Sequence, residues 1–537
     1  MASSRRTRIL ILGGGCAGVY AAMALEKRLG RDSDVEIGLV SRDNYLVFQP
    51  LLPEVISGSI GILDTLAPIR RLCPNTNLYV RAVEGIDLEK RVVTTSSGFR
   101  PHPYQLEYDH LVLALGSITD FGGQPGLREH AFPFKYLGDA LVLRNHIIHA
   151  LEEADIEQDP QLRQALLTFV VAGGGFSGVE VVAQINDFVR KVAGSFRHIE
   201  KDQIRVVLLA GARILPELPE DLATFAHRVL QRNGVEIRLN TRLAGATADS
   251  ALLPRGEKIP TKTLVSTVPT APNPLIAALA CKKDRDRIVV NDDLAVPDFP
   301  GVWAIGDCAW VLDRHTGQPC PPTAQHATRQ AVCCANNIVA TLRGRPPQPF
   351  AFKALGKMGG LGHHSAVAEI LDLKLSGFFA WLLWRLIYLM KLPGLDRKVR
   401  VATDWFLDLL LKPDIVQLRT HDAPAVGREH FEPHETIFEQ GDRGDRLYII
   451  VDGEVEVVKR DTGGSEVVLA VLGPGDCFGE MALVSDLRRM ASARSRTSVN
   501  LLTVDRTAFS ALFGALPPLR GLFQQLIERR SAAVAER

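Results

Sequence analysis

Two glycine loops of the same design carry the clearest chemical signal in this sequence. Their glycines stand at the same spacing: Gly13, Gly15 and Gly18, then Gly173, Gly175 and Gly178. In each loop, G-x-G-x-x-G follows a short apolar run and precedes helix-forming sequence, as in loops whose backbone approaches a pyrophosphate at a helix N-terminus. Two such loops predict that one chain binds two dinucleotides and transfers electrons between them.

Parallel sheets are needed to hold these loops, and the first half of the chain alternates strand-like runs with helical segments. Residues 19–29 are expected to form the helix after the first loop. Residues 35–40 and 205–209 are expected to form the second strand of each unit. Strands that end at Gly116 and at Gly306-Asp307 predict two further places where backbone approaches a cofactor.

The acid that usually binds the adenosine ribose at the end of the second strand is absent from both units. Ser41-Arg42 stands there in the first unit, where the serine hydroxyl can still contact a ribose. Leu209 stands at the corresponding place in the second unit. The sequence therefore shows no acid for the adenosine ribose in either unit.

Size and composition limit the remaining possibilities. A chain of 537 residues is expected to form three or four domains. Its net charge of +1 gives no argument for nucleic-acid binding. The eight cysteines are scattered and include no C-x-x-C, which favours reduced thiols and counts against a redox-active disulfide beside a flavin. No metal site is expected.

Residues 375–411 are strongly apolar but interrupted by charge. The run 375–390 contains Arg385, and the run 405–411 follows a basic turn at 397–400. Both are too short to span a bilayer, whereas apolar helices flanked by Trp, Tyr and cations are typical of a membrane interface. The alternative is a buried helical hairpin or a dimer interface. The arginines at residues 5–8 precede only a short apolar run, so no secretion signal is expected.

The order of these motifs over about the first four hundred residues resembles the type II NADH:quinone oxidoreductases, single-chain FAD enzymes with two dinucleotide-binding units. The first glycine loop matches the FAD loop of that family, residues 44–52 match its stretch beside the flavin, and residues 173–180 match its NADH loop. Gly306-Asp307 matches the motif that binds the FAD ribityl chain. Residues 324–330 resemble the quinone-site motif A-Q-x-A-x-Q, and residues 377–405 resemble the membrane-anchoring helices.

This resemblance implies a role for each matching residue. The FAD residues would be Gly13, Gly15, Ala17, Gly18, Ser41, Arg42, Gln49, Pro50, Gly116, Gly306, Asp307 and Gln325. The NADH residues would be Gly173, Gly175, Phe176, Gly178 and Glu180. The catalytic residues would be Glu180, Gln325, Arg329 and Gln330, with Glu180 gating hydride transfer or relaying a proton to quinone. The alternatives are a first-turn glutamate favoured by the helix dipole for Glu180 and a helix-capping amide for Gln325.

Three positions depart from the family pattern. The second glutamine of the quinone motif is Arg329, followed by Gln330, and a guanidinium donates hydrogen bonds but cannot accept them. Leu209 replaces the ribose acid, which leaves the choice between NADH and NADPH open. Pro269 stands where a glycine near a cofactor is expected, so that loop is open to displacement.

From residue 421 onward, short alternating strands separated by glycine turns predict a separate all-β domain. Residues 431–508 resemble the cyclic nucleotide-binding domain, and residues 478–492 match its phosphate-binding cassette. The resemblance implies that Glu480 binds the ribose 2′-hydroxyl and that Arg489 binds the cyclic phosphate. The other cassette residues are Gly479, Met490 and Ala491. Met490 favours cAMP over cGMP, because cGMP-selective members tend to have a hydroxyl residue there.

The fold class expected is α/β, with two Rossmann-like dinucleotide-binding domains, a short helical membrane-interface segment and an all-β jelly-roll domain. The expected boundaries are 1–165 and 262–350 for the FAD unit, 166–261 for the NAD(P)H unit, 351–416 for the anchoring region, 417–430 for the linker and 431–537 for the cyclic nucleotide-binding domain. The function expected is FAD-dependent, non-pumping oxidation of NADH by a membrane quinone. It would take place peripherally on the cytoplasmic face of a bacterial inner membrane, in a possible homodimer, under cyclic nucleotide control.

Two alternatives remain open. The first is a quinone reductase with another donor such as sulfide, which relies on cysteines near the flavin, for which Cys308, Cys333 and Cys334 are the candidates. The second is a flavoprotein scaffold without catalysis, whose output is nucleotide-dependent binding to a membrane or a partner.

Overall fold

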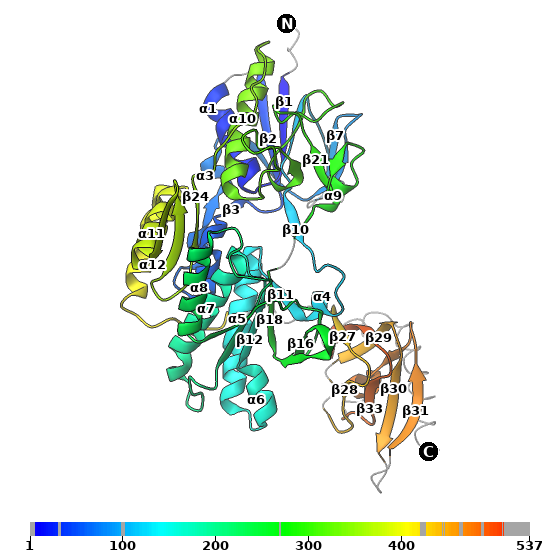
Figure 1. The fold of residues 1–537 in the computed structure, drawn as a ribbon. Coiled ribbons are helices and arrows are strands. Elements are labelled where there is room, and N and C mark those ends of the chain that lie inside the picture. Colours follow the sequence, from blue (N-terminus) through cyan, green and yellow to red (C-terminus); the bar gives the residue numbers. More distant parts are fainter. Residues whose placement is uncertain are drawn as a thin grey trace.

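Two parallel five-stranded sheets, one in each nucleotide-binding unit, form the body of the molecule (Figure 1). The computed structural model describes residues 6–30, 34–97, 103–267, 270–418, 426–442, 444, 446–460, 466–484, 488–506 and 508–509. Pro269, singled out above, lies outside these residues. Within them, every helix falls short of the length and apolarity that a bilayer crossing requires.

The first unit has the sheet order β22-β9-β1-β2-β5. Its strands are β1 (Thr7–Leu12), β2 (Val35–Ser41), β5 (Asn77–Val80), β9 (His110–Leu113) and β22 (Val302–Ala304). Helices α1 (Cys16–Leu29) and α10 (Ala324–Leu342) pack against each other on one face. Both α1 and β2 coincide closely with the expected helix and strand. The apolar strands form one core with these helices.

Smaller elements complete the first unit. They are β3 (Tyr45–Val47), η1 (Gln49–Leu51), α2 (Leu52–Ser57), η2 (Ile62–Thr65), β4 (Leu66–Pro68), α3 (Ile69–Leu72), β6 (Val83–Asp87), β7 (Val92–Thr95), β8 (Tyr104–Glu107), α9 (Pro274–Ala277), β20 (Lys283–Asp284), β21 (Arg287–Val289), η5 (Gly306–Cys308) and β23 (Ala309–Trp310).

The second unit has the sheet order β11-β18-β12-β13-β14. Its strands are β11 (Ala131–Pro133), β12 (Thr168–Ala172), β13 (Arg205–Leu209), β14 (Val235–Arg238) and β18 (Thr263–Ser266). Its helices are α4 (Leu127–His130), α5 (Leu137–Ile156), α6 (Pro160–Leu166), α7 (Phe176–Val192), η3 (Ala193–Ser195) and α8 (Glu220–Arg232), and the small sheet beside them contains β15 (Gly245–Thr247), β16 (Ser250–Leu252), η4 (Pro254–Gly256) and β17 (Lys258–Pro260).

The chain passes between the two units along a pair of antiparallel strands, β10 (Ser117–Thr119) and β19 (Thr270–Pro272). The sequence placed these crossings at residues 165/166 and 261/262. In the structure the crossings lie at β10 and β19 instead, because β11 and β18 pair in the second sheet and α5 packs in the core of that unit. Strands of three residues are too short for their periodicity to be read from the sequence.

A third layer bridges the two units on one side of the molecule (Figure 1). It contains the antiparallel strands β24 (Gly356–Gly360), β25 (Ala366–Ile370) and β26 (Leu373–Gly377), followed by helices α11 (Phe378–Lys391) and α12 (Leu395–Asp408). Strand β24 contacts α7 of the second unit, and α12 contacts η2 of the first.

The C-terminal domain contains two four-stranded antiparallel sheets, as the all-β pattern predicted. Its elements are β27 (Val426–Phe431), β28 (Thr436–Phe438), β29 (Arg446–Asp452), β30 (Val455–Arg460), β31 (Glu466–Leu472), β32 (Cys477–Phe478), α13 (Glu480–Val484), β33 (Ser492–Ser495) and β34 (Val499–Asp505). In Figure 1 this domain lies beside β16 and α4 of the second unit, on the side opposite α11 and α12.

Candidate functional site

The first glycine loop is folded so that its own backbone closes it tightly. Gly13 has a φ of +117°, and a Cβ there would collide with the carbonyl oxygen of Ala114. Cβ atoms at Gly14 and Gly18 would likewise collide with the Ser41 hydroxyl and with the Gly13 carbonyl. Around Gly15, by contrast, no atom of the described part of the chain lies within 4 Å of such a Cβ. The loop is therefore closed on the protein side and open at the N-terminus of α1, which is the shape that a pyrophosphate requires.

Asp307 lies next to this loop. Its charge contributes to raising the pKa of Cys16, at the start of α1, to about 11, although burial is the larger cause. A Cβ on Gly306 would lie 3.0 Å from the Cβ of Ala17. Ser117 Oγ donates to Asp307 Oδ2 at 3.0 Å, and Lys135 Nζ lies 2.6 Å from Ser117 Oγ. Four segments thus meet near Asp307: the first glycine loop, the end of β9, the end of β22 and strand β10.

Ser41 and Arg42, which stand where the first unit usually has its ribose-binding acid, differ in exposure. Ser41 is buried, and its hydroxyl donates to the carbonyl oxygen of Asp43 at 2.7 Å. Arg42 is exposed, with its guanidinium carbon 5.8 Å from the ring centre of Tyr136. Arg42 therefore lies where the two units approach each other.

The second loop repeats the geometry of the first. Gly173 has a φ of +128°, and a Cβ on Gly178 would collide with the Gly173 carbonyl. The ring of Phe176, in the first turn of α7, packs against Gly359 of β24. One turn further along, Glu180 Oε1 accepts a hydrogen bond from the backbone N–H of Gly360 at 3.0 Å.

Glu180 is held in an environment that disfavours its charge. Burial raises the pKa of Glu180 to about 8, and the neighbouring carboxylate of Glu54 adds to the rise, while the Gly360 N–H opposes it. A carboxyl group with a pKa near the working pH can both release and accept a proton. Glu180 is thus suited to proton transfer, and its position is decided by β24 rather than by α7 alone.

Strand β24 assembles the residues of both units. Gln325 Nε2, from α10 of the first unit, donates to the Gly356 carbonyl at 2.8 Å, and Gly360 at the other end of the strand holds Glu180. Gln325 Oε1 is buried, and none of the described residues donates a hydrogen bond to it. This acceptor fits a donor on a bound cofactor. The sequence reading missed β24, although four glycines within residues 356–362 signal a strand that other groups approach closely.

The three polar residues of the quinone motif do not lie together. Gln330 is 2 % exposed, and its Oε1 accepts a hydrogen bond from the Gly306 N–H at 2.8 Å. Gln330 therefore positions the Gly306-Asp307 turn. Arg329 is exposed, with its guanidinium carbon 5.5 Å from the ring centre of Phe352. Helical geometry separates the three residues, because residues 325 and 329 share one face of α10 whereas residue 330 lies on another face.

The stretch expected beside the flavin lies against the third layer. The Phe48 ring packs edge-on against Tyr388 of α11, with 6.0 Å between ring centres. Pro50 lines the same cavity as Glu180, while Gln49 is exposed. Burial, with the nearby Glu180, raises the pKa of the Tyr388 hydroxyl.

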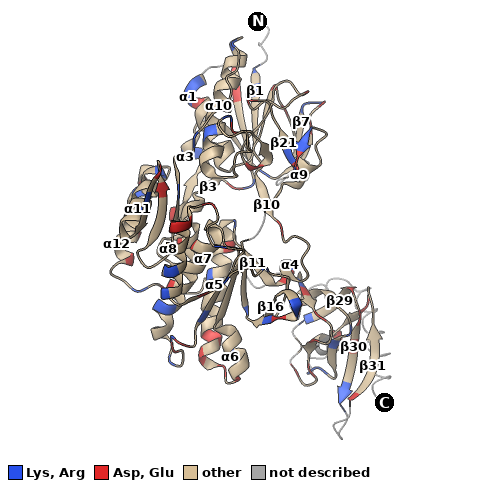
Figure 2. Ribbon diagram, viewed as in Figure 1, with Lys and Arg blue, Asp and Glu red and all other residues tan. Residues whose placement is uncertain are grey.

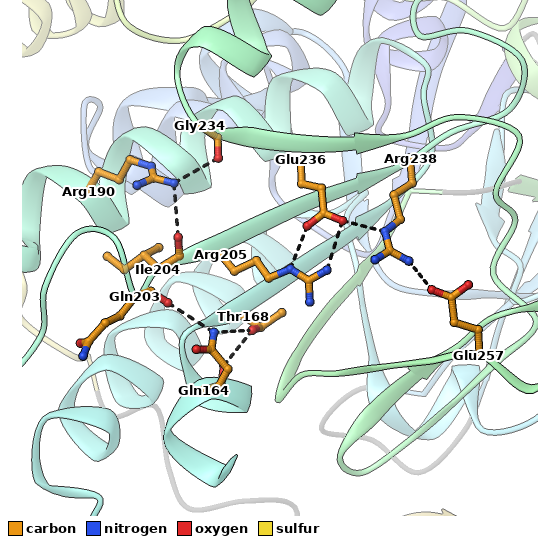
Figure 3. Close-up of polar contacts among 10 residues, drawn as sticks. All are labelled: Gln164, Thr168, Arg190, Gln203, Ile204, Arg205, Gly234, Glu236, Arg238 and Glu257. Carbon is orange, nitrogen blue, oxygen red and sulfur yellow. Dashed lines mark hydrogen bonds and ion pairs between the residues drawn. The ribbon is translucent and has the colours of Figure 1, made fainter. Parts of the chain in front are cut away.

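Leu209 occupies the end of β13, where the second ribose acid was expected. It is 1 % exposed and packs with Val207, Leu243 and Leu253. The neighbouring surface of the sheet carries a charge network (Figure 3): Glu236 accepts from Arg205 and from Arg238, and Arg238 donates to Glu257. Arg238 pairs with Leu209 in the sheet register.

The cysteines considered for sulfide chemistry are buried or half-buried thiols. Burial raises the pKa of Cys308 and of Cys333 to about 11, and that of Cys334 well above its ordinary value. A thiol must be deprotonated to act as a nucleophile. Their environments therefore disfavour the reactivity that a sulfide-oxidising site needs.

The cassette of the β-domain has its acid and its arginine buried, at 1 % exposure for Glu480 and 4 % for Arg489. Arg489 donates to the carbonyls of Gly479 and Arg446 at 2.6 and 2.9 Å, and its guanidinium carbon lies 4.2 Å from the ring centre of Phe438. Gly479 has a φ of +83°, which lets its backbone approach Arg489. Met490 beside it is 42 % exposed.

Comparison with known proteins identifies the class that this fold and site define. Residues 7–331 match the pyridine nucleotide-disulphide oxidoreductase family. Residues 355–412 match the NDH2 C-terminal domain, and residues 428–515 match the cyclic nucleotide-binding domain. The fold class expected from the sequence is thereby confirmed.

Individual relatives narrow this class. The type II NADH:quinone oxidoreductase Ndh of Mycobacterium tuberculosis is 33% identical over 445 residues, covering 80% of this chain and 93% of the relative. The demethylphylloquinone reductase NdbB of Synechocystis is 33% identical over 411 residues, covering 74% of this chain and 96% of the relative. NDH2 of Plasmodium falciparum, solved with NADH, has a similar fold, with a TM-score of 0.71 at 19% identity, covering 77% of this chain and all of the other. The chain belongs to the type II NADH:quinone oxidoreductases, and it carries a cyclic nucleotide-binding domain at its C-terminal side.

Proposed function

We propose that this enzyme binds FAD at its first glycine loop and NADH at its second, and that it passes two electrons from NADH to a membrane quinone. The observation that carries the proposal is the junction at β24, where Gln325 from one unit and Glu180 from the other are held on a single strand. The open space at Gly15 and the orphaned Gln325 Oε1 both fit FAD.

Each of these residues has a separate task. FAD, when bound, supplies the hydride acceptance and two-electron transfer that side chains lack. Asp307 offers its carboxylate to ribityl hydroxyls, while Ser117 and Gln330 hold the turn that carries it. Gln325 accepts a hydrogen bond at Oε1, and Glu180 holds or releases a proton at Oε1 or Oε2. The α7 N-terminus receives the NADH pyrophosphate.

The test is anaerobic mixing of the FAD-loaded protein with NADH, followed by a soluble quinone analogue. We expect loss of flavin absorbance on the first mixing and its return on the second. Glu180→Gln and Gln325→Leu should slow turnover at least tenfold, whereas Glu152→Gln, an exposed change on α5, should not. Absence of bleaching by NADH and by NADPH would favour the scaffold alternative, and bleaching by sulfide alone would favour the other donor.

Peripheral membrane association is part of the proposal, and the third layer supports it. Helix α11 presents one face to the core through Ala380 and Trp384, and leaves its other face exposed. The exposed apolar residues of this layer include Phe378, Phe379, Leu382, Leu386, Met390, Leu395, Val399 and Phe406. Figure 2 shows that α11 carries little charge along its length. Such a face fits a lipid interface on the cytoplasmic side of a bacterial membrane, where NADH is made.

Co-sedimentation with anionic phospholipid vesicles tests the membrane assignment. Phe379→Glu combined with Phe406→Glu should abolish binding, whereas Ile156→Glu, at an equally exposed apolar residue on α5, should not. If the double variant instead dissociates a dimer and leaves vesicle binding unchanged, the exposed face is a dimer interface.

Regulation by a cyclic nucleotide, with cAMP favoured, is the last part of the proposal. Its support is the contact between the β-domain and the second unit. His130 Nε2 of α4 lies 2.8 Å from the carbonyl oxygen and 3.0 Å from the amide nitrogen of His430 in β27. Lys258, the residue after Glu257, has its Nζ 3.7 Å from Glu435 Oε1 of the β-domain. The cassette follows β32, at the opposite edge of the sheet that ends in β27.

This contact has a short connection to the cofactor site. Five residues after His130, Lys135 contacts Ser117, which donates to Asp307. A shift of the β-domain on ligand binding would therefore act on the segment that crosses between the two units. The test is NADH–quinone turnover with and without cAMP or cGMP. We expect a change in rate that is lost in Arg489→Ala and reduced in His130→Ala, while binding of cAMP is retained in His130→Ala. An unchanged rate at saturating nucleotide would refute regulation and leave the oxidoreductase assignment intact.

A further inference from the structure

The two glycine loops differ at the point where their helices begin. At Gly15 of the first loop, an added Cβ meets no atom of the described chain within 4 Å. At the equivalent Gly175 of the second loop, such a Cβ would lie 3.7 Å from Glu217 Oε1. Glu217 belongs to the loop 210–219 between β13 and α8, so its carboxylate reaches α7 from another part of the chain. A carboxylate therefore lies at the phosphate-binding end of the second unit, and the first unit has no counterpart to it among the described residues.

The start of α7 attracts such a carboxylate. Gly175 is the N-cap of the helix and has no side chain that could accept a hydrogen bond, and the first turn of α7 contains no acid. The unpaired N–H groups of that turn and the positive end of the helix dipole both favour an anion. A bound pyrophosphate uses the same N–H groups. The Glu217 carboxylate and a pyrophosphate therefore compete for one place, because two anions repel each other at such short range.

The loop 210–219 holds its backbone in place and leaves the Glu217 side chain exposed. Arg213 Nη2 donates to the carbonyls of the residues on either side of Glu217, Pro216 and Leu218, at 2.6 and 3.0 Å. The Glu217 side chain points outward from this braced backbone and is exposed. Exposed side chains change rotamer on a picosecond to nanosecond timescale. The carboxylate can therefore leave the start of α7 without any change in the loop.

A positive charge reaches the same place from the third layer. Alternate residues of a strand share a face, so Lys357 lies on the face of β24 on which Gly359 packs against the Phe176 ring of α7. Lys357 Nζ donates to the backbone carbonyl of Glu217 at 2.7 Å. An ammonium group has three donors, and a carbonyl neutralises none of its charge. Lys357 is therefore suited to bind an anion at the start of α7.

We propose that the Glu217 carboxylate stays at the start of α7 until the pyrophosphate of the dinucleotide displaces it, and that Lys357 is the cation that then binds this pyrophosphate. The inference rests on the proposed binding of NADH at the second glycine loop. Glu217 weakens binding and Lys357 strengthens it. NADH and NADPH share the pyrophosphate, so neither residue selects between them. A substrate that leaves after each hydride transfer needs such moderated binding, whereas the first loop retains FAD.

Calorimetric titration of the FAD-loaded protein with ADP-ribose tests both residues without a redox step, because ADP-ribose contains the pyrophosphate and lacks the nicotinamide. We expect Glu217→Gln to bind it about threefold more tightly than the wild type and Lys357→Gln about threefold more weakly, since a solvent-screened charge contact is worth little more. High salt should reduce both differences. Glu220→Gln and Lys353→Gln make the same charge changes at exposed residues nearby and should bind as the wild type does.

Each outcome decides the inference. Weaker binding in Glu217→Gln would make this carboxylate a ligand of the dinucleotide and would overturn the displacement. Unchanged binding in either variant would overturn it as well. The 2′-phosphorylated form of ADP-ribose should respond to both variants as ADP-ribose does, and a response to only one of the two ligands would assign the residues to the adenosine ribose instead. Failure of the wild type to bind ADP-ribose and to be reduced by NADH would overturn the proposed function itself, whereas normal flavin reduction with wild-type affinities in both variants would overturn this inference alone.

Discussion

Replacing Glu54 by glutamine should loosen the α11–α12 hairpin, because Glu54 is one of two carboxylates around a buried arginine. Arg385 Nη2 lies 3.8 Å from both Glu54 Oε1 and Asp408 Oδ2, and the three side chains are 5–11 % exposed. The guanidinium carbon of Arg385 lies 4.3 Å from the ring centre of Trp381 and 4.7 Å from that of Trp405. Glu54 Oε2 also accepts a hydrogen bond from Trp405 Nε1 at 2.5 Å.

The magnitude follows from what the substitution leaves behind. Removing one partner of a buried ion pair costs about 3–5 kcal/mol, because the other charge remains buried. Since Asp408 stays in place and glutamine can still accept from Trp405, we expect the lower end, about 3 kcal/mol. Each 1.4 kcal/mol corresponds to a factor of ten in an equilibrium constant, so local opening of the hairpin should become roughly 100-fold more frequent.

Amide hydrogen exchange measured by mass spectrometry on peptides from α11 and α12 reports this opening directly. The same peptides should be unchanged in Glu152→Gln. The triple variant Glu54→Gln, Arg385→Met, Asp408→Asn removes all three charges and should return towards the wild-type rate, since no unpaired charge then remains buried. Wild-type exchange in Glu54→Gln, or a triple variant as labile as the single one, would refute the argument.

Three further predictions concern the cofactor sites. A carboxyl group whose pKa is raised in the folded state contributes stability that is lost as pH rises through that pKa. The pKa of Glu180 is raised to about 8. We therefore expect calorimetry to show that Glu180→Gln is more heat-stable than the wild type at pH 9 and equal to it at pH 4. Gly15→Ala should keep the thermal stability of the FAD-free protein and yet bind FAD at least tenfold more weakly in a fluorescence titration, because a Cβ there meets no atom of the residues that the structure describes within 4 Å and lies on the side proposed for the pyrophosphate. With Leu209 in place of the ribose acid, kcat/KM for NADPH should lie within about tenfold of that for NADH, since a hydrogen bond to a charged group is worth about 1.5–3 kcal/mol; a preference for NADH of a thousandfold or more would show that another residue selects the cofactor.

Local signals in the sequence were sufficient for the elements that bind nucleotides. The strand at 205–209 was predicted to the residue, and the helix and strand after the first loop were located within a few residues, because glycine turns and apolar runs are local properties of the chain. The family assignment rested on the same ordered motifs and is confirmed. The crossing strands β10 and β19 were missed, because three residues carry no measurable periodicity.

Contacts between distant segments could not be predicted from local sequence patterns. Gln330 lies five positions from Gln325, and only the packing of α10 shows that it holds Gly306. Arg385 looked like an interruption of an apolar helix, and only the placement of Glu54 and Asp408 shows it to be a buried ion partner. Such pairings depend on residues far apart in the sequence, and no pattern within one segment contains them.

The sequence by itself determined what the chain can bind, because a glycine loop at the start of a helix creates a phosphate site wherever the helix is placed. The tertiary structure alone decided how those sites work together. Strand β24, far along the chain from both loops, contacts Gln325 through the Gly356 carbonyl and Glu180 through the Gly360 N–H. It also decided that the β-domain rests on α4, a few residues from the segment that joins the two units. Short motifs determine which groups a segment of the chain can bind, whereas contacts between distant segments decide which of these groups lie side by side.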